Sequence, residues 1–377
     1  MISFIKGLYF DLDCRVRRMI SLLKGNNYHA DIQKDFVPKT IEHLEDLQGL
    51  LQAKINGVDL EIDILANNNL YEFNEFNEFF QTIELYRFEV IINYDEPEIY
   101  FNKKVARIYD EIRHLSIPPV ITTISNSENY YWAHPVFEII ALPFGEENNL
   151  LNLPDLYHEI GHLICKQYPN IVEAKFTPLL QNYFAQEIDR SYDEKTHEHY
   201  VPFFKGKLKR WEEYWIEEFT CDMIATYLCG PAFAWANMKM SALSNGANAI
   251  YSDNPSHPSD ESRMRAVFMM LNKTGFTQEC QEISNSWDQF LVHTNNPKHP
   301  DYKYIFPNEL LSALAEIVFD YCKGIDLATY SEQTANGQKP ISKIVNDAWQ
   351  ELHRNPVEFE KLQQTMIGEI RASILGH

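Results

Sequence analysis

The sequence predicts a mainly α-helical protein with a small β-sheet. Two stretches, residues 36–52 and 101–115, carry apolar residues at steps of three and four, which is typical of one helix face. Two shorter stretches rich in β-branched residues, Val120 to Ser125 and Val136 to Leu142, predict strands. Pro118 and Pro119 separate the second helical stretch from the first strand, because proline is poorly tolerated inside a helix. We therefore expect helices on both sides of a short β region.

Taken in order, the chain divides into three expected regions. Residues 1–118 form an N-terminal helical region to which we assign no chemistry, residues 119–275 form a central domain, and residues 276–377 form a C-terminal helical region. In the central domain, residues 171–205 predict one helix to Ile188, followed by a polar loop to Tyr200. The strands precede the segment that carries the chemistry.

That segment contains His158-Glu159-Ile160-Gly161-His162 within an apolar helical pattern. Residues four apart lie on the same helix face, so His158 and His162 can direct two imidazole nitrogens at one metal ion, and Glu159 is placed to accept a proton from a metal-activated water. Gly161 allows another backbone or the metal site to come close. The alternative is a core helix whose histidines are buried and hydrogen-bonded. The His-Glu-x-x-His pattern itself favours a zinc site.

A catalytic zinc ion needs a third protein ligand, and Glu218 is the best candidate. It shares a mostly apolar helix face with Asp222, and a carboxylate on such a face needs a partner or a metal ion. Asp222 is placed to accept the second N–H of a ligand histidine. Glu217 is the rival ligand, but it points about a quarter-turn away. The full face comprises Trp211, Trp215, Glu218, Asp222, Ala225 and Cys229.

These motifs, in this order, resemble the gluzincin metallopeptidases. A third segment, from His257-Pro258 to Arg263-Met264, is similar to the His-Pro-x-x-x-x-Arg-Ile element of the CAAX prenyl endopeptidase and HtpX family, with Met264 in place of the usual Ile. The resemblance implies that His257 lies near the substrate carbonyl and that Arg263 supports the metal site. Read alone, the same segment is an ordinary helix start with acids in its first turn.

The resemblance implies a zincin-like metallopeptidase core flanked by helical regions, in a soluble and divergent member of the family. In that family the strand before the ligand helix lies at a sheet edge, where the substrate adds as a further strand. The corresponding stretch here is Val136 to Leu142, with an ordinary core strand as the alternative. The ImmA/IrrE-type regulators, which also join His-Glu-x-x-His to a later Glu-bearing helix, are the second resemblance.

Composition limits the partners. A formal charge of −21, from 33 basic and 54 acidic side chains, disfavours nucleic acid and anionic membrane surfaces. No apolar run approaches the roughly 18 residues of a membrane-spanning helix, and the N-terminal residues lack a secretory signal pattern. The six cysteines show no C-x-x-C pair, as expected for free thiols in a reducing compartment. We expect a cytoplasmic protein.

The sequence therefore predicts a zinc metalloendopeptidase, a hydrolase acting on a peptide or protein substrate. Its zinc ligands are His158, His162 and Glu218, with Glu159 as general base and Asp222 behind a ligand histidine. The alternative is a zinc-binding regulatory or interaction protein of ImmA/IrrE type without general protease activity. A structural zinc site usually has four ligands and favours cysteine, whereas three ligands and no cysteine are visible here. Oligomeric state is left open.

Overall fold

The computed structural model describes residues 2–57, 66–114, 116–125, 130–143, 145–193, 197–243, 250–293, 297–335 and 337–375. The chain divides into two compact units. Unit 1 comprises Met1–Asn102, Pro119–Ile124 and Phe137–Ala141, and unit 2 comprises Lys103–Pro118, Ser125–Val136 and Leu142–His377. The structure is mainly helical with one small sheet, which confirms the predicted fold class. The division into three regions stays a prediction.

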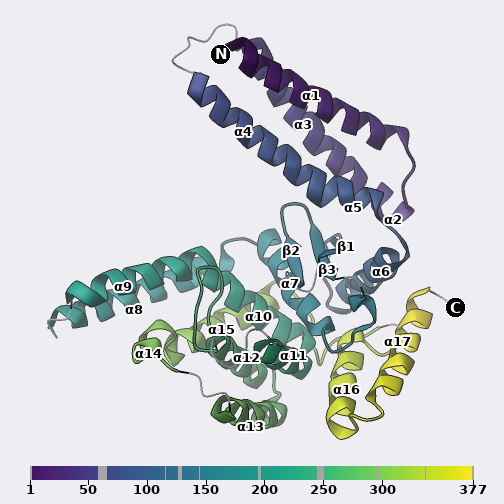
Figure 1. The fold of residues 1–377 in the computed structure, drawn as a ribbon. Helices are drawn as coiled ribbons and strands as arrows, with labels where there is room; N and C mark the ends of the chain where they lie inside the picture. Colours follow the sequence, from purple (N-terminus) through teal and green to yellow (C-terminus); the bar gives the residue numbers. More distant parts are fainter. Residues whose placement is uncertain are drawn as a thin grey trace. The chain divides into compact units, whose positions relative to one another are not determined.

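Unit 1 is built on three long helices that pack against one another, α1, α3 and α4 (Figure 1). Their buried faces follow the expected helical spacing, for example Leu44, Leu47 and Leu51 on α3. The helical elements that begin in this unit are α1 (Ile2–Gly25), α2 (Ala30–Gln33), α3 (Phe36–Gly57), α4 (Ala66–Ile83), the π-helix η3 (Glu84–Phe88), α5 (Glu89–Ile92) and α6 (Glu96–Glu111).

A buried arginine ties the parts of unit 1 together. Arg87, on η3, donates hydrogen bonds to Thr40 Oγ1 at 2.8 Å, to the Phe137 carbonyl at 2.8 Å and to the Phe36 carbonyl at 3.2 Å. Burial lowers the pKa of Arg87 to about 10. The guanidinium remains charged at neutral pH, and its three acceptors compensate for its removal from water.

The sheet has three strands in the order β1-β3-β2. Strand β1 (Val120–Ser125) matches its prediction, β2 (Trp132–His134) was not predicted, and β3 (Ile139–Pro143) starts three residues later than expected. Residues 136–138 form a turn before β3. Because β3 is the middle strand, both of its edges are already paired. The assignment of Val136 to Leu142 as an edge strand that receives substrate is therefore wrong.

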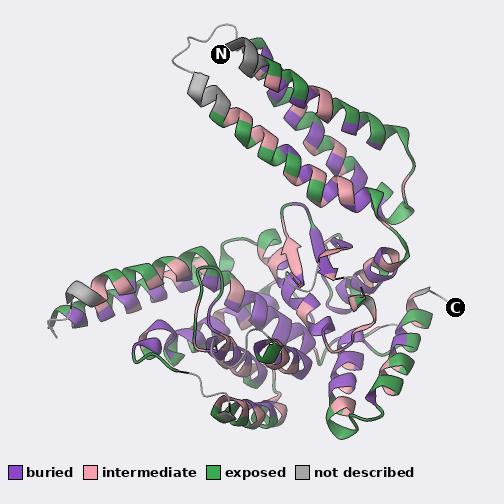
Figure 2. Ribbon diagram, viewed as in Figure 1, coloured by how far each residue is buried: buried purple, intermediate pink, exposed green. Residues whose placement is uncertain are grey.

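Unit 2 is organised around α10 (Ile216–Cys229), which contacts α7, α11, α12, α15 and α16 and is buried along almost its whole length (Figure 2). The remaining elements are η4 (Glu146–Asn148), α7 (Leu153–Gln167), α8 (Ile171–Asp193), α9 (His197–Arg210), the π-helix η5 (Trp211–Trp215), α11 (Pro231–Leu243), α12 (Asp260–Lys273), α13 (Thr277–His293), α14 (Tyr302–Ile305), α15 (Asn308–Gly324), α16 (Ile341–Arg354) and α17 (Phe359–Leu375).

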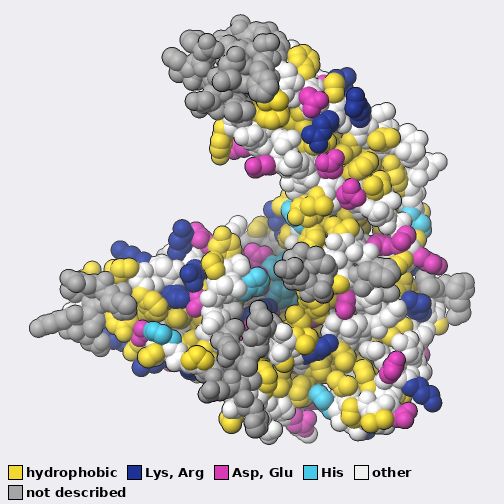
Figure 3. All heavy atoms as spheres, viewed as in Figure 1, with side chains coloured by type: hydrophobic (Ala, Val, Ile, Leu, Met, Phe, Trp, Pro, Cys, Tyr) yellow, Lys and Arg dark blue, Asp and Glu magenta, His cyan; other side chains and the backbone are white. Residues whose placement is uncertain are grey.

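The segment between the two motif helices is more helical than predicted. Helix α8 continues to Asp193, and α9 starts at His197, where the sequence suggested a loop to Tyr200. Proline at positions 178 and 202 is accommodated inside these two helices. Basic side chains gather over this pair of helices although the whole chain is acidic (Figure 3), and the last turn of α9 carries Lys207, Lys209 and Arg210.

Two predictions from composition can be compared with the structure. No helix within the described ranges is both long enough and apolar enough to cross a membrane. All six cysteines are free thiols, as the absence of a paired spacing suggested, and four of them are buried: Cys221, Cys229, Cys280 and Cys322.

Helices α7 and α10 approach each other closely at Gly161. A Cβ atom added to Gly161 would lie 3.0 Å from Cys221 Cα and 3.1 Å from its Cβ, both nearer than ordinary van der Waals contact. Backbone, unlike the end of a long side chain, cannot move aside cheaply. The close backbone approach expected from the sequence at this glycine is therefore present.

We predict that Gly161→Ala lowers the free energy of unfolding by about 1–3 kcal/mol, because the added methyl group forces α7 and α10 apart. Urea unfolding followed by circular dichroism measures the change. Gly206→Ala is the matched control, since Gly206 lies inside α9 and has no atom within 4 Å of its added Cβ. There we expect a gain of roughly 0.5–1 kcal/mol from higher helix propensity. Equal effects in the two variants would contradict the close-packing argument.

Candidate metal centre

Helix α7 supplies two histidines and the acid between them. Leu153 and Pro154 open the helix, where proline costs no hydrogen bond, and its apolar residues, including Leu156 and Ile160, are buried in unit 2. Residues four apart share a face, and the rings of His158 and His162 lie with their centroids 5.0 Å apart. Packing of the helix therefore fixes both imidazoles on one side of α7.

Helix α10 presents carboxylates to these imidazoles. Of its 14 residues, all are buried except Glu217 and Glu218. Glu218 Oε2 lies 3.5 Å from His158 Nε2, and Glu218 Oε1 lies 3.7 Å from His162 Nε2. The structure thus brings the two histidines of α7 together with a glutamate that lies about 60 residues further along the sequence. Their nitrogen and oxygen atoms are close enough for one metal ion to bridge them.

These three side chains fit a tetrahedral zinc site. Zinc–nitrogen and zinc–oxygen bonds of about 2.0–2.2 Å at tetrahedral angles place ligand atoms about 3.3–3.6 Å from one another. The observed 3.5 Å lies within this range and the observed 3.7 Å lies just above it, and both are too long for good hydrogen bonds. Among the described residues, Glu218 Oε2 is also a buried oxygen without a hydrogen-bond partner. A cation between the three groups would satisfy that oxygen.

Each histidine is oriented by a second carboxylate. His158 Nδ1 donates to Asp222 Oδ1, and His162 Nδ1 donates to Glu217 Oε1, both at 2.9 Å. Because a carboxylate only accepts, the proton of each neutral imidazole is held on Nδ1, and the Nε2 lone pair is left for a metal. The sequence predicted this role for Asp222. It considered Glu217 only as a rival ligand, so its pairing with His162 was missed.

Arg263 completes the support behind His158. Its Nε and Nη2 atoms donate to the two oxygens of Asp222, each at 2.7 Å. Burial disfavours the ionised carboxylate, but Arg263 and His158 outweigh burial and lower the pKa of Asp222. Asp222 in turn outweighs burial at Arg263 and raises the pKa of that guanidinium. Hydrogen bonds therefore run without a break from Arg263 through Asp222 to His158, at the candidate metal centre.

Acidic neighbours dominate the electrostatics of the ligand histidine. Burial lowers the pKa of His158, but its hydrogen bond to Asp222 and the negative charge of the nearby Glu218 outweigh burial and raise the pKa to about 10. At Glu218 burial raises the pKa, and His158, Arg263 and His162 together lower it below its usual range. The site attracts positive charge strongly, as a cation site must.

Glu159 lies beside these side chains and lines a cavity that also reaches His158 and Glu218. It is 8% exposed, and burial raises the pKa of its carboxyl above the usual value. A carboxylate with a raised pKa is a better proton acceptor, which suits a general base. No described nitrogen of a Lys, Arg or His side chain lies within ion-pair distance of it, so its oxygens are available to the cavity.

His257 and Arg263 both reach this cavity from the segment that follows α11. His257 Nε2 lies 3.8 Å from Glu218 Oε2, and its side chain is half exposed. Asn254 Oδ1 accepts a hydrogen bond from the His257 amide at 2.7 Å, and Ser256 Oγ contacts His257 Nδ1 at 2.8 Å. The loop therefore holds the imidazole beside Glu218, at the edge of the candidate metal centre.

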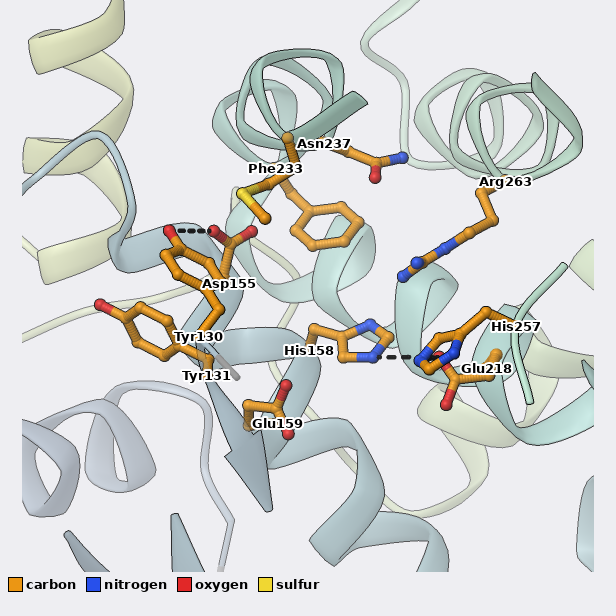
Figure 4. Close-up of a pocket in the computed structure, with 11 residues that line it drawn as sticks. Tyr130, Tyr131, Asp155, His158, Glu159, Glu218, Phe233, Asn237, His257 and Arg263 are labelled. Atoms are coloured by element: carbon orange, nitrogen blue, oxygen red, sulfur yellow. Dashed lines mark hydrogen bonds and ion pairs between the residues drawn. The ribbon is translucent and has the colours of Figure 1, made fainter. Parts of the chain in front are cut away.

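A cavity of about 230 Å³ opens beside the centre (Figure 4). On the side away from Glu218 it is lined by Tyr130, Tyr131 and Phe233, which the sequence did not single out. The only signal was the aromatic run from Tyr130 to Trp132, and nothing local connects it to α7. The complete lining is Tyr130, Tyr131, Asp155, His158, Glu159, Glu218, Phe233, Asn237, Met240, His257 and Arg263.

Comparisons with protein-family models, with curated proteins and with solved structures found no match to this chain.

We predict that Asp222→Ala weakens zinc binding about 10- to 100-fold, because His158 loses the acceptor that fixes its tautomer and orientation. Glu217→Ala should weaken it less, since the Glu217 side chain is 48% exposed and water can replace it. A competition titration with a zinc-selective chelator measures both. Glu213→Ala, on η5 and in contact with neither histidine, is the control. An equal affinity for all three variants would refute the assigned roles.

Proposed function

We propose that this chain is a zinc-dependent metallopeptidase of gluzincin type that hydrolyses peptide bonds. The observation that carries the proposal is the convergence of His158 Nε2, His162 Nε2 and a Glu218 oxygen around one point, with Glu159 beside them in an open cavity. A purely structural zinc site has no need of an extra buried acid facing a cavity.

When bound, a zinc ion held by these three ligands supplies Lewis-acid activation of water and of the substrate carbonyl. Glu159 accepts the proton of the attacking water and then delivers it to the amine nitrogen as the C–N bond breaks. Its burial in the cavity wall raises its pKa and so favours the first of these steps, acceptance of the proton. Asp222 and Glu217 hold the two imidazoles still during the reaction.

His257 is proposed to donate a hydrogen bond to the oxygen of the substrate carbonyl. Its Nε2 faces the Glu218 side of the cavity, and Nδ1 is engaged by Ser256, so the ring has a fixed direction. A donor aimed at the oxygen on which charge develops stabilises the transition state. Arg263 is a positioning residue, because it acts on His158 through Asp222.

We predict that Glu159→Gln retains the metal but lowers the rate of peptide cleavage by about 10²- to 10⁴-fold, because glutamine cannot accept the proton. His162→Ala should lose the metal as well. Metal content by mass spectrometry and cleavage of a peptide library distinguish the two effects. Asp288→Asn, an exposed acid on α13, is the control for removing a carboxylate.

Two results would overturn the proposal. The first is purified protein without zinc whose metal content does not change in His162→Ala. The second is one zinc per chain with no cleavage of any peptide and with Glu159→Gln indistinguishable from the parent. That second result would favour a zinc-binding regulatory or interaction protein.

A further inference from the structure

Asp155 has an unusual place in the cavity of unit 2. In the sequence it is an ordinary acid in the first turn of α7, where the helix dipole favours negative charge. In the structure its side chain lines the cavity, and Asp155 Oδ2 accepts a hydrogen bond from Tyr130 Oη at 3.1 Å (Figure 4). That is its one side-chain hydrogen bond among the described residues. An acid that only started the helix would have no reason to face the cavity.

The charge of Asp155 is incompletely compensated by the protein. No described Lys or Arg nitrogen lies within the 4.0 Å of an ion pair with it. The basic groups that act on Asp155 through their charge are His158 and, with a smaller effect, Lys239, whose ammonium donates to Asn152 Oδ1. Burial raises the pKa of Asp155 to about 7, as expected of a carboxylate that lacks a cation. A bound cation would remove this cost.

The surroundings of Asp155 are aromatic. Tyr130 and Tyr131 pack edge to face with ring centroids 4.8 Å apart, and Phe233 stands across the cavity. Tyr130 adopts a φ of 52°, a left-handed conformation that is unfavourable for a residue with a Cβ and is found where surrounding structure enforces it. Aromatic faces attract cations and also pack on methylene groups. We call Tyr130, Tyr131, Phe233 and Asp155 the tyrosine–aspartate subsite.

We propose that the tyrosine–aspartate subsite binds a lysine or arginine side chain of the substrate, next to the peptide bond that is cleaved. The inference rests on the proposed peptidase function. A basic side chain matches both parts of the subsite, because its methylene stem packs on the rings while its charged end meets the carboxylate. The whole cavity, which also reaches the candidate metal centre, has a volume of about 230 Å³ and is smaller than the roughly 300–1,000 Å³ of sites for drug-sized ligands, so its part beside Asp155 suits a side chain and not a larger group.

The position of the subsite follows from α7. Asp155 precedes Glu159 by four residues, so the two carboxylates lie on one helix face about one turn, or 5–6 Å, apart. Glu159 faces the bond to be broken, and a side chain on an adjoining substrate residue reaches one turn along the helix. The subsite thereby selects a residue at one fixed place beside the cleaved bond.

The test compares peptides that differ at one residue beside the cleaved bond: lysine, norleucine, and lysine acetylated on its side-chain nitrogen. With the zinc-loaded parent protein we expect kcat/KM to be at least about 10-fold higher for lysine than for either neutral residue. Acetylation keeps the stem and removes the charge, so it isolates the role of Asp155 without altering the protein. In Asp155→Asn the ratio of lysine to norleucine should fall to within about 3-fold of one.

Two further variants show whether the ratio of kcat/KM for lysine to that for norleucine depends on the charge of Asp155. Tyr130→Phe removes the hydroxyl group but keeps the ring and the carboxylate, so the preference for lysine should persist. Asp288→Asn should leave both the ratio and the rates as in the parent. The ratio is insensitive to a general loss of rate, and zinc content and circular dichroism identify variants that fail to fold. Loss of the preference in Tyr130→Phe as complete as in Asp155→Asn would contradict a charge effect.

Failure of this inference is distinguishable from failure of the proposed function. Cleavage that is as fast at norleucine as at lysine overturns the subsite and leaves the peptidase standing. If no peptide is cleaved, equilibrium binding of fluorescent lysine and norleucine peptides to zinc-loaded Glu159→Gln decides. At least about 10-fold tighter binding of the lysine peptide, lost when Asp155→Asn is added, supports the subsite. Equal binding of the two peptides refutes it.

Discussion

The candidate site depends on the contact between α7 and α10 at Gly161. Because this residue has no side chain, the backbone of α7 comes within contact distance of Cys221 on α10. Cys221 lies three residues after Glu218 and directly before Asp222, so the contact sets the distance between the imidazoles of one helix and the carboxylates of the other. A wider spacing would leave the two histidines facing separate partners, without a common centre.

That contact brings together charges that the protein alone does not balance. Around the imidazoles lie three carboxylates, of Glu217, Glu218 and Asp222, and one guanidinium, of Arg263. Glu159 adds a fourth carboxyl group beside them, so acidic side chains outnumber the guanidinium at this point. Burial makes this imbalance energetically significant, since uncompensated charge costs more free energy in a low dielectric than in water. The excess of acidic groups therefore supports the proposed cation, in addition to the identity of the three ligands.

Much of this arrangement was predictable from the sequence, for reasons that can be stated residue by residue. A spacing of four puts His158 and His162 on one face, and an acid on an apolar helix identifies Glu218 and Asp222. Periodicity gives the direction of a side chain but not its reach, so Glu217, whose side chain meets His162, was read as a rival ligand. The face was also traced through Trp211 and Trp215, which lie in the π-helix η5 and do not follow the α-helical step.

The parts that could not be predicted depend on strand order and on distant contacts. The local sequence predicted a strand before α7, but a strand's own residues do not show which other strands pair with it, so the pairing of β3 on both sides could not be predicted. Strand β2 is too short, at three residues, to show a period. Likewise Tyr130 and Tyr131 become part of the cavity wall only because the chain returns them to the start of α7, as the hydrogen bond from Tyr130 to Asp155 records.

Each end of the cavity contains a carboxyl group that the described part of the protein does not pair with a positive charge. Asp155 and Glu159 are buried acids one turn apart on α7, and burial raises the pKa of each. Like charges at this spacing repel each other. Near Glu159 the compensating charge would come from a metal ion that stays with the protein. Near Asp155 it would come from a substrate that leaves after each turnover. A weakly compensated acid at that end would suit the proposed subsite, because it would favour a basic residue over a neutral one only while the substrate is bound.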